Sequence, residues 1–214
     1  YLPALVAPLL PVAALAQEQT ASELDPLHRL ENPHRSAVEV ILDSARMAGL
    51  PTRPIESTAL QGISKEKNGR LIVTVVRDVY HSLLRARSAL GPTATQAELT
   101  AAANALRVGI TTVELAHLGA SRGGDKELTV PLVVLSDLVM RGVPRDTASR
   151  TIFQLWQRGA ADDDFLGLWR GVERDIVSGT DPGVALMNRA REIPPRAPPP
   201  TSPPYCGPVS SATT

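Results

Sequence analysis

Residues 71–90, LIVTVVRDVYHSLLRARSAL, decide the fold class of this chain. The first six, LIVTVV, are rich in β-branched side chains and by themselves would suit a strand. Beyond them, however, apolar residues keep recurring every three or four positions. This is the 3.6-residue period of an α-helix, so the stretch predicts one long helix. The positions on its apolar stripe are Ile72, Val75, Val76, Val79, Leu83, Ala86 and Leu90.

Similar stripes elsewhere are separated by five short joints. In each joint a Gly follows the stripe, then comes a small or apolar residue, then a Ser, Thr, Asp or Pro that can open the next helix. Gly tolerates the left-handed backbone after a helix end, and the residue behind it can pack on the last turn, as in a Schellman motif. The joints are AGLPTRP (48–54), RVGITTVEL (107–115), MRGVPRDT (140–147), QRGAADDDF (157–165) and VSGTDPGV (177–184).

Three capping boxes, each a Ser or Thr followed three residues later by Glu, mark further helix starts. Together these signals predict an all-α fold of about eight or nine short helices with Gly-capped loops. The spacing of the joints is uneven, 33 residues from Gly109 to Gly142 but 17 from Gly142 to Gly159. An irregular helical bundle and a degenerate helical repeat both fit this spacing. The boxes are Ser36 with Glu39, Thr95 with Glu98, and Thr111 with Glu114.

The N-terminal segment predicts export. Residues 1–16 are apolar and uncharged and end in Ala14-Leu15-Ala16, an A-x-A site suited to signal-peptide cleavage before Gln17. The run is shorter than the roughly 20 residues that span a membrane. We therefore expect a signal peptide truncated at its start and a protein of the periplasm or extracellular space. After cleavage we expect no integral membrane segment.

The rest of the chain divides into three parts. We expect a polar linker at 17–35, one all-α domain at 36–193 and a disordered, proline-rich tail at 194–214. The only cysteine, Cys206, lies in that tail, where it can stay free or pair between chains. The chain carries 22 basic and 22 acidic residues, a balance that argues against a nucleic-acid partner.

Three consecutive aspartates precede an apolar stripe in QRGAADDDFLGLWRG, residues 157–171. We interpret Asp162 as a helix N-cap, and Asp163 and Asp164 as first-turn residues whose charge the helix dipole favours. A metal site would need further converging ligands, and the spacing of a calcium loop is missing. We therefore expect no metal or cofactor at this stretch.

A second motif, GASRG at 119–123, matches the G-x-S-x-G pattern with Ser121 as nucleophile. That pattern works where a strand delivers the serine into a sharp turn and a helix follows. Here a helical stretch, TVELAHL, comes before it, and a loop-like stretch follows. A Gly- and Ser-rich connector is the favoured interpretation, and a small serine hydrolase is the alternative.

The histidines and tryptophans are weaker candidates for a functional site. His28 and His34 could hold a transition metal only weakly, because no Cys or suitably spaced carboxylate accompanies them. His81 lies off the apolar stripe, and we expect it on a solvated face. Trp156 and Trp169 fall at apolar spacing, which predicts core packing.

These patterns favour an exported, non-catalytic helical protein. It would be a protein-interaction or structural module of the cell envelope or secretome, with a protein partner whose identity the sequence does not specify. The alternative is a small exported serine hydrolase using Ser121 in GASRG. Weak metal binding through His28 and His34 is a third possibility. We assign no catalytic, cofactor-binding or metal residue outside these alternatives.

Export yields the first prediction. If Ala14-Leu15-Ala16 is the cleavage site, N-terminal sequencing of protein from the native host should begin at Gln17, in an extracytoplasmic fraction. An intact N-terminus on cytosolic protein would contradict it.

Overall fold

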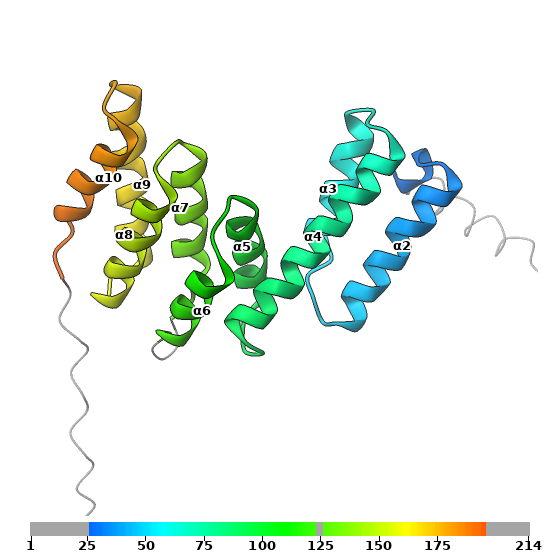
Figure 1. Cartoon of the computed structure of the whole chain (residues 1–214), viewed down its shortest axis with the longest axis horizontal. Helices are drawn as coiled ribbons and strands as arrows, with labels where there is room; N and C mark the ends of the chain where they lie inside the picture. The colour runs from blue at the N-terminus through cyan, green and yellow to red at the C-terminus, as the bar shows by residue number, and fades with distance from the viewer. Residues whose placement is uncertain (1–25, 123–125, 196–214) are drawn as a thin grey trace, which may run out of the picture. The chain divides into compact units, whose positions relative to one another are not determined.

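The computed structural model describes residues 26–122 and 126–195. All regular structure in these residues is helical, which confirms the predicted all-α class (Figure 1). The predicted long helix over 71–90 is α4. The elements are η1 (Pro26–Arg29), α2 (Asn32–Met47), α3 (Arg53–Ser64), α4 (Gly69–Leu90), α5 (Gln96–Arg107), α6 (Thr112–Ala120), α7 (Thr129–Met140), α8 (Arg145–Gln157), α9 (Asp162–Val177) and α10 (Pro182–Arg191).

The first helices begin earlier than the capping box at Ser36 predicts. The helix α2 starts at Asn32, with a proline in its first turn, and Ser36 lies inside it. Before it, the short helix η1 is followed by Leu30, and both Leu27 and Leu30 are buried. Buried leucines and a proline suited to a helix start override the Ser36 box. The predicted polar linker at 17–35 is therefore wrong from residue 26 onward.

The other two capping boxes are confirmed. Thr95 N–H donates to Glu98 Oε2 at 2.8 Å, and Glu98 N–H donates to Thr95 Oγ1 at 3.2 Å. Thr111 and Glu114 form the same reciprocal pair, at 2.8 and 3.2 Å. Each box satisfies backbone donors that the first turn of a helix leaves unpaired.

Five of the described helices end in the predicted Schellman motif with Gly. At the end of α7, Gly142 has φ +92° and donates to Val139 O at 3.0 Å, while Val143 N–H donates to Leu138 O at 3.0 Å. Val143 is only 2% exposed, because the motif folds it back against the core. The same pair of bonds closes the helices before Gly49, Gly109, Gly159 and Gly179, all with positive φ.

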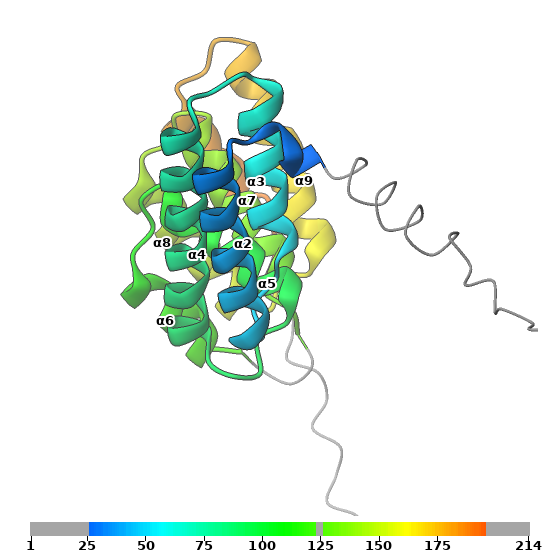
Figure 2. The same ribbon diagram turned by 90° about the vertical axis from the view of Figure 1, so that its right-hand side faces the viewer.

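The described residues belong to two compact units, one with residues up to 88 and 92–103, the other with 89–91 and 104 onward. In the first unit, His34 near the start of α2 packs against Gly69 at the start of α4. Near the end of α4, Arg87 donates to Gly49 O, just after α2, at 2.9 Å. The helices α2 and α4 therefore run in the same direction, with α3 as their neighbour (Figure 2).

In the second unit, a helix also packs against the next helix but one along the chain. The helix α7 contacts α8 and α9, and α10 contacts α8 and α9 (Figure 1). The joints between helices also meet. Arg145 Nη1 donates to Gly109 O at 3.2 Å, and Gly183 packs on Pro144. Contacts between successive joints thus fix how α6, α8 and α10 start relative to one another.

The two tryptophans differ in burial. Trp156 is 5% exposed, which confirms its predicted core position, and its Nε1 donates to Ser121 O at 3.3 Å. Trp169 is only partly buried, and the guanidinium of Arg141 lies 5.3 Å from its ring centre. The prediction of core packing is therefore wrong for Trp169. Its indole lies at the α7–α9 boundary, where a cation can stack on it.

We predict that Gly142→Ala lowers the free energy of unfolding by about 1 kcal/mol, because a residue with a Cβ is strained at this positive φ. The matched control is Gly167→Ala, inside α9, where a Cβ would meet nothing within 4 Å. There alanine should raise stability by about 0.5–1 kcal/mol. Chemical denaturation measures both, and equal shifts of the two midpoints would contradict the left-handed cap.

Candidate functional site

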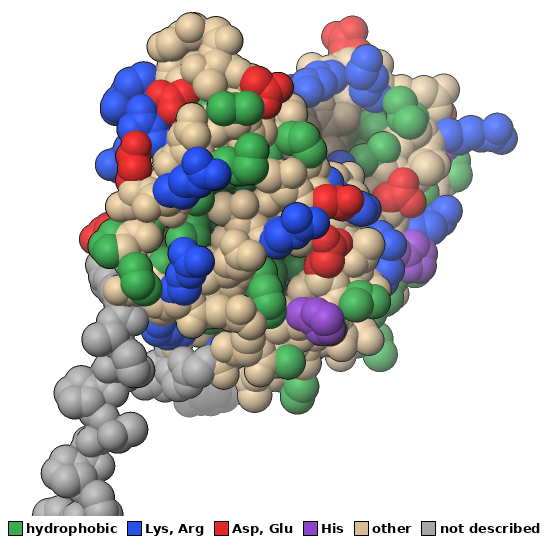
Figure 3. All heavy atoms as spheres, turned by 60° about the vertical axis from the view of Figure 1, so that its left-hand side comes forward, with side chains coloured by type: hydrophobic (Ala, Val, Ile, Leu, Met, Phe, Trp, Pro, Cys, Tyr) green, Lys and Arg blue, Asp and Glu red, His purple; other side chains and the backbone are tan. Residues whose placement is uncertain are grey.

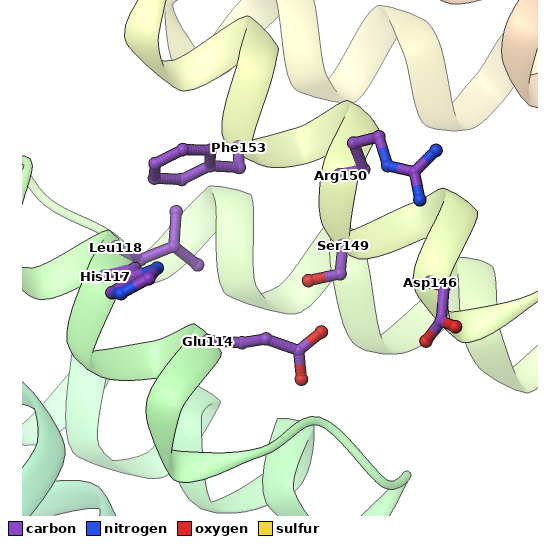
Figure 4. Close-up of a pocket in the computed structure, with 7 residues that line it drawn as sticks. All are labelled: Glu114, His117, Leu118, Asp146, Ser149, Arg150 and Phe153. Atoms are coloured by element: carbon purple, nitrogen blue, oxygen red, sulfur yellow. The ribbon is translucent and has the colours of Figure 1, made fainter.

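An open groove of about 300 Å³ lies between α6 and α8 (Figure 4). Its side chains recur at helical spacing on each wall, so one face of each helix turns toward the other. The lining residues are Glu114, His117 and Leu118 from α6, and Asp146, Ser149, Arg150 and Phe153 from α8.

Glu114 lies in the middle of the groove, opposite Ser149 (Figure 4). Its Oε2 accepts hydrogen bonds from the backbone N–H and the hydroxyl of Thr111, at 2.8 and 2.7 Å. Partial burial raises the pKa of Glu114. The bonds from Thr111, a bond from Ser149 and the charge of Arg145 outweigh that effect, so the pKa lies below its ordinary value. Glu114 is therefore ionised at neutral pH.

The two ends of the groove differ in character. At one end the rings of His117 and Phe153 lie 6.5 Å apart at a tilt of 38°, next to the buried Leu118. At the other end lie Asp146 and the exposed Arg150 (Figure 4). Asp146 Oδ1 accepts two bonds from Arg145, at 2.9 and 2.7 Å. Among the described residues the Arg150 guanidinium has no hydrogen-bond or ion-pair partner.

Sequence patterns did not single out this groove. Glu114 stood out only as part of a capping box, and His117, Ser149, Arg150 and Phe153 carried no motif. Polar residues at i and i+3 on α6 and at i, i+3 and i+4 on α8 are a usable signal, but only once the two helices are known to be neighbours. That pairing depends on the contact between the Gly109 and Gly142 joints.

Ser121 lies at the C-terminal end of α6, with φ −86° and ψ 6°. Its hydroxyl donates to Leu118 O at 2.9 Å, as in a helix end. Gly119 packs on Leu90, and a Cβ there would lie 3.4 Å from the Leu90 backbone, an ordinary van der Waals contact. Gly123 lies outside the described residues. Ser121 thus follows a helix instead of a strand, the arrangement expected of a connector.

The three aspartates start α9, but not as predicted. The N-cap is Ala161, with φ −93° and ψ 170°, so Asp162 as N-cap is wrong by one residue. Asp164 makes the capping bond instead, its Oδ2 accepting from Ala161 N–H at 2.8 Å. The N-cap falls at Ala161 because Gly159 and the buried Ala160 complete the end of the previous helix. Ala161 is then the first extended residue before α9.

The histidines are dispersed. His28 Nδ1 lies 3.0 Å from Arg35 Nη1, and His34 packs on Gly69. His81 is exposed, as predicted, with its ring 5.6 Å from that of Tyr80. Within residues 26–122 and 126–195, no three His, Cys, Asp or Glu side chains cluster in a way that could hold a metal ion. Cys206, the A-x-A site and the tail beyond residue 195 lie outside the described residues.

No helix in the described part of the chain is both long and apolar enough to cross a membrane. On the face shown in Figure 3, basic and acidic side chains are interspersed, with hydrophobic side chains scattered between them. No known family, curated protein or solved structure matches the chain.

The capping of α9 gives a prediction that separates the three aspartates. Asp164→Ala should lower the free energy of unfolding by about 1 kcal/mol, because it removes a hydrogen bond to a backbone donor at the helix start. Asp162→Ala and Asp163→Ala should cost less, about 0.3–0.5 kcal/mol, since they lose only the interaction with the helix dipole. Urea denaturation followed by tryptophan fluorescence measures all three. A larger loss at Asp162 would restore it as the cap.

Glu114 gives a prediction about pH. Its folded pKa lies below its ordinary 4.5, so ionisation stabilises the fold above that pH. The contribution is lost as pH falls through the folded pKa. Glu114→Gln keeps an acceptor for Thr111 but removes the charge. It should cost about 0.5–1 kcal/mol at pH 7, and this cost should shrink as pH falls through the folded pKa of Glu114.

The matched control is Glu127→Gln, an exposed carboxylate outside the groove. Its effect on stability should be small from neutral to acid pH. Thermal denaturation across this range measures both variants. A constant difference between Glu114→Gln and the native protein would contradict the role of the Glu114 charge.

Proposed function

We propose that this chain is an exported, non-catalytic module that binds a protein partner through the α6–α8 groove. One observation carries the proposal: the acids of the groove are engaged in structural bonds, while its aromatic end and Arg150 are open to a ligand. Glu114 caps α6, and Asp146 is held by Arg145. What remains free suits recognition, since aromatic and arginine side chains dominate binding energy at protein interfaces.

The acid–base properties of the groove favour binding over catalysis. A general acid or base works best with a pKa near the operating pH. The pKa of Glu114 is shifted the other way, below its ordinary value. The Ser149 hydroxyl faces this carboxylate and helps to lower its pKa. His117 neighbours the Phe153 ring, on the apolar side of the groove.

The place of action rests on the N-terminal segment. We propose that residues 1–16 direct export and are removed before Gln17, which puts the partner in the cell envelope or outside the cell. The support is the uncharged apolar run and its A-x-A site.

The second unit has the features of a degenerate helical repeat, and we propose that it is one. Its joints at Gly109, Gly142 and Gly179 follow one another by 33 and 37 residues. Each is in contact with the next, through Arg145 on Gly109 and Pro182 on Gly142. In such arrays each pair of helices packs on the next, and the stacked helices present extended binding surfaces.

Partner capture with groove variants tests the proposed function. The chain from Gln17 to Thr214 is used as bait on envelope extract of the native host, as the native protein and as Arg150→Glu and Phe153→Ala. The control is Arg170→Glu, which reverses an exposed arginine of α9 outside the groove. We expect a partner that is retained by the native and control proteins and lost from both groove variants.

Two results would contradict the proposal. One is a partner retained equally by all four proteins. The other is hydrolysis of activated esters that Ser121→Ala abolishes while the fold is preserved, which would favour the hydrolase.

A further inference from the structure

We propose that Asn68 is a modification site, at which the folded chain deamidates spontaneously to aspartate and isoaspartate. The site lies in the first unit, between α3 and α4. Its co-reactant is water, and isoaspartate formed there loosens the start of α4. The inference does not rest on the proposed function.

The chain contains four asparagines, and they differ in the residue that follows. Deamidation requires the backbone nitrogen of the next residue to attack the side-chain amide. Asn32 precedes a proline, which has no N–H. Asn104 and Asn188 lie inside α5 and α10, where backbone N–H groups are paired within the helix. Asn68 precedes Gly69, and no other asparagine of the chain is followed by a glycine.

The attacking nitrogen, that of Gly69, is unpaired and unhindered. Gly69 is the first residue of α4, so its N–H is one of the donors that a helix start leaves over. Among the described residues this N–H has no hydrogen-bond partner. Glycine also lacks a Cβ, which in other residues crowds the attacking nitrogen. Packing requires glycine here, because a Cβ at position 69 would lie 2.5 Å from His34 Nδ1.

The attacked group, the Asn68 side-chain amide, is exposed and polarised. Its Oδ1 accepts a hydrogen bond from Arg70 N–H at 2.8 Å. This donor stabilises the negative charge that develops on the oxygen during attack, as backbone donors do in an oxyanion hole. The Asn68 amino group, which must leave, has no hydrogen-bond partner in the described part of the chain. The bond that caps α4 therefore also favours the reaction.

The reaction needs only a base and water. A base removes the Gly69 N–H proton, the nitrogen bonds to the side-chain carbonyl carbon of Asn68, and the amino group leaves as ammonia with a proton. The product is a cyclic succinimide. Water then opens one of its carbonyl–nitrogen bonds. Opening at the side-chain carbonyl gives aspartate. Opening at the main-chain carbonyl gives isoaspartate, in which the chain runs through the former side chain.

The two products affect α4 differently. Aspartate keeps an oxygen for Arg70 N–H and adds a negative charge at the helix start, which the helix dipole favours. Isoaspartate inserts a methylene into the main chain between residues 68 and 69. The Asn68 carbonyl, which accepts from Ile72 N–H at 3.1 Å, then no longer belongs to the main chain. The first turn of α4 loses its fixed position against His34, so this product destabilises the first unit.

Peptide mapping of the whole folded chain, incubated at mildly alkaline pH, tests the site. Mass spectrometry detects the change from amide to carboxyl, and chromatography separates isoaspartate from aspartate. We expect conversion of Asn68 at least about ten-fold faster than that of Asn104 or Asn188, because attack at those residues first requires a helix to open. In Asn68→Gln position 68 should stay unmodified, since glutamine would have to close a larger ring. A sample unfolded in urea supplies the rate of the open chain.

Three results would overturn the proposal. The first is an Asn68 that stays intact in the folded protein while it is converted in urea, because the helix start would then protect it. The second is equal conversion of Asn68, Asn104 and Asn188 in the folded protein. The third concerns melting: Asn68→Asp should melt no lower than the native protein and the isoaspartate form should melt lower, so equal melting temperatures would contradict the loosening of α4. None of these results bears on the α6–α8 groove.

Discussion

The left-handed helix end is the constraint on which the rest of the structure depends. A Gly with positive φ closes each of five helices, and the residue after it donates back across the last turn. In four of them that residue is buried, so the joint is anchored in the core at the point where the chain reverses. The next helix follows at once: the N-caps Thr111, Pro144, Ala161 and Asp181 all lie two residues after the Gly. A fixed joint of this kind sets the direction of each helix.

The groove is a consequence of two such joints. The Gly109 joint starts α6 and the Gly142 joint starts α8, and the bond from Arg145 to Gly109 O ties them together. Arg145 also holds Asp146, and its charge helps to keep Glu114 ionised. One arginine thus connects the backbone geometry of the joints to the electrostatics of the groove. Beyond it lie His117, Phe153 and Arg150, the side chains that we propose for recognition of a partner.

Sequence patterns predict the local features of this fold and miss those that depend on tertiary neighbours. Helical periodicity, the Gly joints and the boxes at Thr95 and Thr111 are all local, and the structure has them. The start of α2 was missed because buried leucines before Ser36 outweigh its capping box. The N-cap of α9 was missed because residue type favoured Asp162, whereas the fixed length of the joint requires Ala161. The groove was missed because no spacing along the chain says that α6 faces α8.

Amide hydrogen exchange of Ile110 and Val143 tests most directly whether these joints hold the groove. Each amide donates across the last turn of the preceding helix, at 3.0 Å, and each residue is 2% exposed. If the joints are anchored in the core, both amides should exchange only on unfolding of their unit, as slowly as the interior of α7. Exchange as fast as at the exposed residues 126 and 127 would show that the joints open on their own. The walls of the groove would then not be fixed, contrary to this account.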